Sequence, residues 1–305
     1  MRRFASALLL PILFAAACGG GASVPKDLPP ASEFPASGEA PKIIIKNAGE
    51  SPRALVITPT AGTTDKVVAV LDMNIKGGGG GQSVSMGFDM TLGGTQTITE
   101  VKTDGNFLQR FELTDPKVKV RGDLAAQLGD SGESMMANML KGMAMVFEFD
   151  NHGRVLSMTN EGGNAAMMGQ MQAGLDQALQ GGAVPLPKDP IGKGAEWQSL
   201  ATVDMMGAKM RMATSYKLLE LDGDKGRLEI SMSGGAEGQK MQMPGSPVEV
   251  DLKSMALTAK GTVGFDLKRP TAGTADIEMK VDMDIKAGGE SGNMSMTVKA
   301  TSKPQ

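Results

Sequence analysis

Residues 276–286 read DIEMKVDMDIK, and apolar and charged side chains alternate through the whole stretch. Isoleucine, methionine and valine occupy the odd positions, whereas aspartate, glutamate and lysine occupy the even positions. Because successive side chains of a strand point to opposite faces of a sheet, this period of two predicts a strand with one apolar face and one face in water. One-sided sheets of this kind are typically antiparallel.

The same alternation recurs along most of the chain from residue 67 onward. Turn signals rich in glycine, asparagine and aspartate separate the runs, as at residues 77–81, 151–153 and 222–224. The pattern predicts roughly ten to twelve strands in a mainly β fold, a large curved antiparallel sheet of the half-barrel or sandwich-like type. The clearest runs place on one face Val67, Ala69, Leu71, Met73 and Ile75; Val84, Met86, Phe88, Met90 and Leu92; Met210, Met212, Tyr216 and Leu218; and Met294, Met296 and Val298.

Two segments follow helical spacing instead. Asp130 stands three residues before Glu133, which resembles a capping box, and Asn164 can cap a second helix that ends at the glycines 181–182. Each helix is short and amphipathic, so we expect both to pack on the apolar face of the sheet. The side chains that would then face a ligand are Met135, Met139 and Met143 in the first helix and Met167, Met168, Met171 and Leu175 in the second.

The N-terminus has the features of an export signal. Two arginines precede residues 4–17, which are apolar apart from one serine and too few to span a bilayer of about 30 Å as a helix. Residues 15–19 read AAACG and resemble the lipobox of bacterial lipoproteins. The resemblance implies cleavage after residue 17 and acyl chains, such as palmitate, on Cys18. By the same resemblance Gly19, which is not aspartate, favours the outer over the inner membrane; the alternative is an ordinary signal peptide with a chance cysteine.

Three parts follow from these patterns: a signal peptide (1–17), a lipidated N-terminus and tether (18–64) and a β-rich domain (65–305). Proline, glycine, alanine and serine dominate the tether, which we expect to be flexible or extended except for a short strand at 42–46. The β-rich part is either one domain or two halves, 65–183 and 184–305. Residues 72–76 and 282–286 are similar, which reflects either a repeated hairpin or shared hairpin chemistry.

The composition weighs against several classes of function. Without Arg2 and Arg3 the chain has 29 basic and 34 acidic side chains, scattered along its length, so we expect no nucleic-acid partner. The only histidine, His152, lies in a predicted turn, and no convergent catalytic set is visible; we therefore expect no enzyme and no cofactor. Methionine is abundant, with 25 residues, and core packing explains most of them. Met241 and Met243 are weak candidates for a Cu(I) site because thioethers are soft ligands.

Two resemblances add to this reading. The architecture expected for residues 66–302 resembles the lipoprotein-carrier half-barrel of the bacterial envelope, although the long helix that begins that fold is not evident. Residues 149–154 (FDNHGR), 187–197 (PKDPIGKGAEW) and 261–266 (GTVGFD) look like motifs of an uncharacterised family of bacterial lipoproteins. These motifs are structural in kind, with Trp197 expected in the core. They imply family membership and no activity.

Two hypotheses of different kinds remain open. In the first, a membrane-anchored envelope lipoprotein holds a lipid or another apolar small molecule between its sheet and its helices. In the second, the lipoprotein has a filled core and acts as a scaffold that binds another envelope protein. A cavity favours the first hypothesis, and a contiguous exposed apolar patch favours the second.

Overall fold

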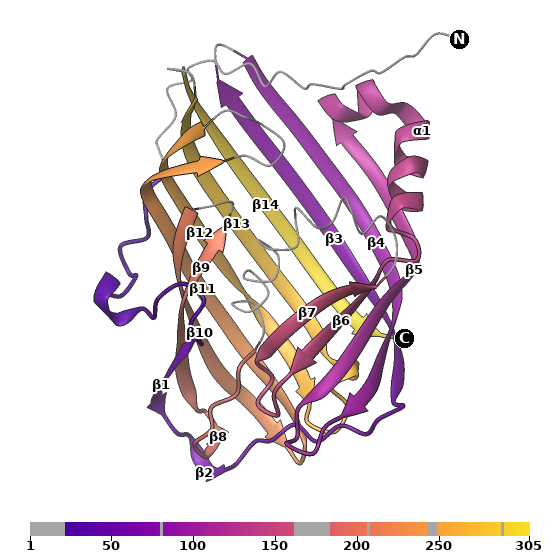
Figure 1. Cartoon of the computed structure of the whole chain (residues 1–305), viewed down its shortest axis with the longest axis vertical. Helices are drawn as coiled ribbons and strands as arrows, with labels where there is room; N and C mark the ends of the chain where they lie inside the picture. Colours follow the sequence, from indigo (N-terminus) through magenta and orange to yellow (C-terminus); the bar gives the residue numbers. More distant parts are fainter. Residues whose placement is uncertain (1–21, 80–81, 162–183, 206–207, 243–248, 288–289) are drawn as a thin grey trace.

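The computed structural model describes residues 22–79, 82–161, 184–205, 208–242, 249–287 and 290–305. Its long strands form one large curved sheet (Figure 1). The elements are η1 (Ala31–Glu33), β1 (Lys42–Asn47), β2 (Glu50–Arg53), β3 (Thr64–Gly79), β4 (Gln82–Val101), β5 (Phe107–Gly122), α1 (Asp123–Leu140), β6 (Ala144–Phe149), β7 (Val155–Glu161), β8 (Ile191–Lys193), β9 (Glu196–Met205), β10 (Ala208–Asp222), β11 (Lys225–Gln242), β12 (Glu249–Asp266), η2 (Pro270–Ala272), β13 (Thr274–Ala287) and β14 (Glu290–Pro304).

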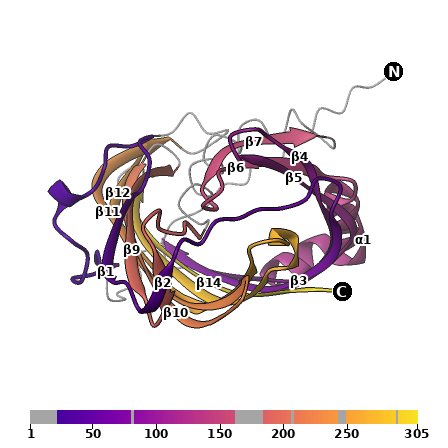
Figure 2. The same ribbon diagram turned by 90° about the horizontal axis from the view of Figure 1, so that it is seen from below.

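The main sheet confirms the expected mainly β, antiparallel fold. Twelve strands pair in the order β1-β9-β10-β11-β12-β13-β14-β3-β4-β5-β6-β7, and β2 and β8 form a separate pair. Seen from below, the main sheet curves into an open half-barrel (Figure 2). The last strand, β14, joins the block β9–β13 to the block β3–β7. The similar segments 72–76 and 282–286 lie in β3 and β13, on the two sides of β14.

The register puts the apolar side chains of neighbouring strands on one face. In the stretch that predicted the fold, now β13, Met279 lies opposite Ala259 of β12 and Val298 of β14. On the other side of β14, Val298 lies opposite Met73 of β3. Because a shift of one residue would turn every side chain to the other face, the alternation excludes such shifts, and the hairpin turns between the strands limit shifts by two residues.

The expected tether, 18–64, lies against the sheet over its described part. Ala22 N donates to Asp284 Oδ2 (2.6 Å), and Thr202 Oγ1 donates to the carbonyl oxygen of Pro35 (2.7 Å). The segment then enters the main sheet as β1, which pairs with β9 and confirms the expected short strand at 42–46. Proline lacks an N–H and cannot donate a backbone hydrogen bond to a neighbouring strand. Side chains of the sheet, such as Asp284 and Thr202, therefore make hydrogen bonds to the backbone of this segment.

Helix α1 begins at Asp123, earlier than the predicted start at Asp130, and contains a kink at Gly129. It lies along the part of β5 that β6 leaves unpaired, since β6 pairs only with Phe107–Glu112. Glu133 Oε1 accepts a hydrogen bond from Val120 N (2.8 Å), and Leu113 N donates to the carbonyl oxygen of Met143 (2.9 Å). The helix and the residues after it therefore cover a strand edge. The second predicted helix, around 164–180, lies outside the described residues.

A dense apolar core occupies part of one end of the half-barrel. We call the end with the β4–β5, β10–β11 and β12–β13 turns the lower end, as in Figure 1. The chain that follows β2 crosses this end in Figure 2, and its Leu55 is buried. Trp197 is 1% exposed, as expected from the sequence, and stacks on Tyr216 with ring centroids 5.2 Å apart. Its Nε1 donates to the carbonyl oxygen of Pro185 (3.1 Å).

Replacement of this tryptophan tests the lower core. We expect Trp197→Ala to lower the free energy of unfolding by about 3–5 kcal/mol, because it removes a buried indole and leaves a cavity. Urea denaturation measures the change. The neighbouring Glu196→Ala, which breaks an ion pair with Lys217 on the opposite, exposed face, should have a much smaller effect. A loss below about 1 kcal/mol for Trp197→Ala would contradict the core placement.

Candidate apolar ligand site

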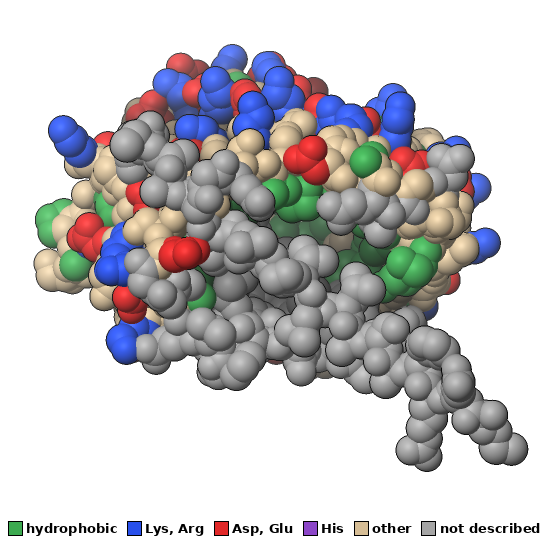
Figure 3. Space-filling view, turned by 90° about the horizontal axis from the view of Figure 1, so that it is seen from above, with side chains coloured by type: hydrophobic (Ala, Val, Ile, Leu, Met, Phe, Trp, Pro, Cys, Tyr) green, Lys and Arg blue, Asp and Glu red, His purple; other side chains and the backbone are tan. Residues whose placement is uncertain are grey.

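The concave face of the half-barrel is almost free of charge. In the described parts of β3–β5 and β9–β14, the registers turn only two charged side chains to the apolar face: Asp65, and Glu290 at the first residue of β14. Arg269 and Thr271 both donate hydrogen bonds to the Asp65 carboxylate. Figure 3 shows hydrophobic side chains inside the hollow seen from above, whereas lysine, arginine, aspartate and glutamate occupy the outer wall.

Ion pairs cross neighbouring strands on the convex face. Arg121 of β5 contacts Asp72 of β3 (2.6 Å) and Asp89 of β4 (2.9 Å). Partial burial would raise the pKa of Asp282 in β13, but hydrogen bonds from Lys280 and Ser295 outweigh it and lower that pKa below its ordinary value. These charged groups indicate that the convex face lies in water, in agreement with the expected solvated side of the sheet.

A cleft of about 430 Å³ lies at the lower end of the concave face. Strands β4–β6 form one side of it, and β12–β14 form the other. Phe107 and Phe149 stack there with ring centroids 5.3 Å apart. Most of the cleft lining is apolar. Its polar side chains include Gln96 and Gln109, and Gln109 Nε2 donates a hydrogen bond to Gln96 Oε1 (3.3 Å). The apolar lining includes Ile57, Phe107, Phe149, Leu186, Val263, Phe265 and Ala275.

The β6–β7 turn holds two separate chain segments against this cleft. Ile57 N donates to the carbonyl oxygen of Asn151, and Leu186 N donates to that of His152, both at 2.8 Å. Gly153 has a φ of +81°, and a Cβ at this position would lie 2.9 Å from the carbonyl oxygen of Val184. The turn therefore requires glycine, and His152 serves in it as a turn residue.

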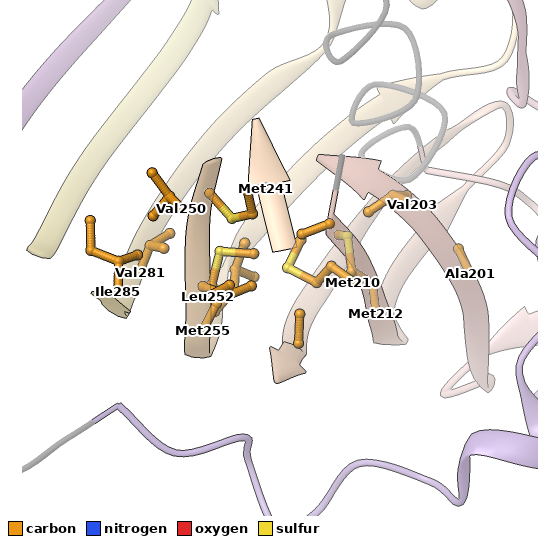
Figure 4. Packing of buried hydrophobic residues seen from close by; sticks show 13 residues of the cluster. Ala201, Val203, Met210, Met212, Met241, Val250, Leu252, Met255, Val281 and Ile285 are labelled. Carbon is orange, nitrogen blue, oxygen red and sulfur yellow. The ribbon is translucent and has the colours of Figure 1, made fainter. Parts of the chain in front are cut away.

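Methionines dominate the apolar face nearer the upper end. Met241, the Cu(I) candidate, is 4% exposed and belongs to a buried cluster with Met210, Met212 and Met255 (Figure 4). Val250 and Leu252 belong to the same cluster, so the position of Met241 agrees with core packing. Met243 lies outside the described residues.

The structure does not bring the predicted ligand-facing residues of the first helix to the cleft. Met135 and Met139 of α1 are 56% and 42% exposed, and Met143 is partly buried beside β5. Cys18 and the second group of candidates, Met167, Met168, Met171 and Leu175, lie outside the described residues. The cleft residues that sequence reasoning missed include Gln96 and Gln109. Both are polar side chains at inward positions of otherwise alternating strands, and that break in the pattern was the available signal.

Other kinds of site receive no support from the described part of the chain. It contains no group of three or more His, Cys, Asp or Glu side chains arranged to hold a metal ion. Among the helices that the structure describes, none is long and apolar enough to cross a membrane.

Comparisons with known proteins leave the family open. No family model matches the sequence, and no curated protein matches it significantly. Among solved structures, an outer membrane channel from Pseudomonas putida F1 aligns over 82% of this chain and 97% of its own, with 6% identity and a TM-score of 0.25. The CymD monoaromatic hydrocarbon channel aligns over 81% and 89%, with 9% identity and a TM-score of 0.13. These scores are too low to carry an argument, so the resemblance to a lipoprotein family stays a prediction.

The lower core also perturbs a titratable group. Burial raises the pKa of Tyr216 above its ordinary value of 10.0, while a hydrogen bond with Thr214 acts in the opposite direction. The folded chain therefore keeps the phenol protonated at pH values where the unfolded chain would ionise it.

This difference predicts a loss of stability at alkaline pH. Below pH 10 the phenol of Tyr216 is protonated in both the folded and the unfolded chain, whereas above pH 10 it stays protonated only in the folded chain. The free energy of unfolding therefore falls above pH 10, by at most about 1.4 kcal/mol per pH unit. Tyr216 is the only tyrosine, so ultraviolet absorbance of the phenolate reports on this group alone. We expect phenolate to appear only with unfolding, and Tyr216→Phe to remove this part of the pH dependence. Reversible ionisation near pH 10 in the folded protein would contradict the buried placement.

Proposed function

We propose that this protein is a lipid-anchored protein of the bacterial cell envelope that holds a lipid or another apolar ligand against its concave face. The observation that carries the proposal is the cleft of about 430 Å³ on an apolar face with little charge. Protein interiors are normally close-packed, with few voids larger than a water molecule. An apolar hollow of this size falls in the range of ligand pockets, about 300–1,000 Å³, and therefore suits an occupant.

The chemistry of the lining limits what such a ligand can be. The one charged residue of the lining is Asp266, whose Oδ1 already accepts hydrogen bonds from the backbone N–H groups of Lys268 and Arg269. The Gln96–Gln109 pair offers neutral donors and acceptors. An anionic headgroup would lose hydration here without gaining a counter-ion, at a large cost in free energy. The lining therefore suits acyl chains or another neutral apolar group.

The anchor in this proposal is the lipobox-like stretch at residues 15–19. Two or three acyl chains on Cys18 give stable membrane attachment, whereas one chain gives only marginal attachment. Attachment to the outer membrane is part of the proposal because residue 19 is glycine.

A second candidate function rests on a different observation. Met135 and Met139 are four residues apart in α1, so they share one helix face, and both side chains are exposed. An exposed apolar stripe of this kind fits a protein partner. In this alternative the protein is a scaffold that binds another envelope protein through α1, and the cleft plays no part.

A substitution that fills the cleft tests the ligand proposal. Native mass spectrometry of protein purified from its own host without detergent should show a bound mass in the lipid range. Ala275→Phe places a ring in the cleft and should weaken binding of a fluorescent phospholipid by about ten-fold, equivalent to about 1.4 kcal/mol. The neighbouring Asp276→Phe, on the convex face, should bind as the unsubstituted protein does. Equal binding by both variants, or no bound lipid at all, would favour the scaffold.

The anchor has its own test. Cys18→Ser removes the thiol that would carry the acyl chains, so we expect the variant to leave the membrane fraction and to lack the acyl mass. Intact mass measurement and membrane fractionation check both expectations. A free, unmodified thiol on Cys18 in the unsubstituted protein would overturn the anchor.

A further inference from the structure

The first described residue, Ala22, lies near the upper end of the half-barrel. Its N–H donates to Asp284 Oδ2 (2.6 Å), and its carbonyl oxygen accepts from Ser254 Oγ (2.5 Å). Asp284 stands three residues before Ala287, where β13 ends. At about 3.3 Å per residue, this attachment point is about 10 Å from the upper end of the strand.

Contacts along the convex face hold the chain that follows. Asp27 accepts a hydrogen bond from Ser233 of β11 (3.1 Å), and the Phe34 ring lies 5.9 Å from the Arg211 guanidinium of β10. Val24 packs against Gly235 of β11, where a Cβ would lie only 2.8 Å from a Val24 methyl group. Residues 22–47 thus form a strap, fixed to β9–β13 and ending in β1. Ala22 cannot swing away from the upper end without breaking these contacts.

Covalent reach then limits where an anchor on Cys18 can be. Ala22 comes four residues after Cys18. A fully extended chain spans at most about 3.6 Å per residue, so the two residues are at most about 14 Å apart. The lower end is farther away than this limit, since Asp284 stands ten residues after Thr274, where β13 begins at the lower end, and ten residues of a strand extend about 33 Å. From this limit we infer that the upper rim of the half-barrel is a docking surface for the phospholipid bilayer. The inference rests on the proposed anchor and adds the orientation of the domain.

Part of the apolar face is open at the upper end, on the side of β3, β4 and β14. Val84, near the start of β4, belongs to the apolar face and is 46% exposed. Met86 and Met294, at similar heights on the same face, are only partly buried. At the upper ends of β10–β13, by contrast, residues such as Met241 are buried, and at the lower end the core around Trp197 lies beside the cleft. Figure 3, which looks into the upper end, shows the hydrophobic lining of the hollow. With the upper rim on the bilayer, a lipid passes between membrane and apolar face with little exposure to water.

Two cysteine variants at opposite ends of β4 test the orientation. Cys18 is the only cysteine of the chain, and acylation blocks its thiol, so an introduced cysteine can be labelled alone. Ser83 is exposed at the upper end, and Thr103 is exposed in the turn at the lower end. We label Ser83→Cys and Thr103→Cys in the full acylated chain with a fluorophore. The labelled proteins are then placed in phosphatidylcholine vesicles that carry a spin-labelled headgroup as quencher.

The expected result is loss of most of the fluorescence at position 83 and none at position 103. Quenching at position 103 alone, at both positions or at neither would overturn the inference. Gly235→Leu supplies a second measurement, because it displaces Val24 and loosens the strap. Quenching at position 83 should then fall while the acyl mass is retained.

Measurements on the same samples separate this inference from the proposed function. An unacylated Cys18 removes the anchor, and with it the basis of the orientation. Unchanged phospholipid binding in Ala275→Phe removes the ligand proposal only. An acylated protein that binds phospholipid at the cleft but is quenched at position 103 keeps the proposed function and loses only the orientation.

Discussion

The alternation of apolar and charged residues along antiparallel strands is the constraint on which the rest of the structure depends. Met279 lies opposite Ala259 of β12 and Val298 of β14, so the apolar side chains of these neighbouring strands share one face. The resulting sheet has one face that must avoid water and one that must meet it. Curvature turns the first face inward, and ion pairs such as Arg121–Asp72 occupy the second. The hollow is thus a consequence of the pattern together with the curvature.

An open sheet leaves strand edges, and the chain covers parts of them with its own segments. β1, drawn from the N-terminal region, pairs with β9, and α1 with the residues after it bonds to the part of β5 beyond β6. Unpaired N–H and C=O groups on such edges invite pairing with other chains. The two covering segments also bear on the two candidate functions: β1 continues into the chain that crosses the lower end beside the cleft, and α1 presents the exposed methionines of the scaffold alternative.

Much of the sheet could be predicted from the sequence because alternation is a local signal. The stretch 276–286 became the centre of β13, and Trp197 is buried as expected. The strap could not be predicted, since its contacts join residues far apart, such as Ala22 and Asp284, and its prolines resemble those of a linker. The start of α1 was misplaced because Glu133 bonds to Val120 of the neighbouring strand instead of serving as a local cap. The cleft escaped prediction because it arises where strands from both blocks meet.

The position of β14 has a consequence for how the chain folds as it is made. This final strand pairs with β3, so Met294 lies opposite Gly77, more than two hundred residues earlier. Synthesis delivers the chain from its N-terminus, which leaves β3 with one unpaired edge until β14 is made. Pairing across such a separation is slow, and exposed edges and apolar faces favour aggregation meanwhile. The β3 edge and the apolar face beside it therefore stay exposed until the final strand pairs, which makes the end of synthesis the decisive step in closing the sheet.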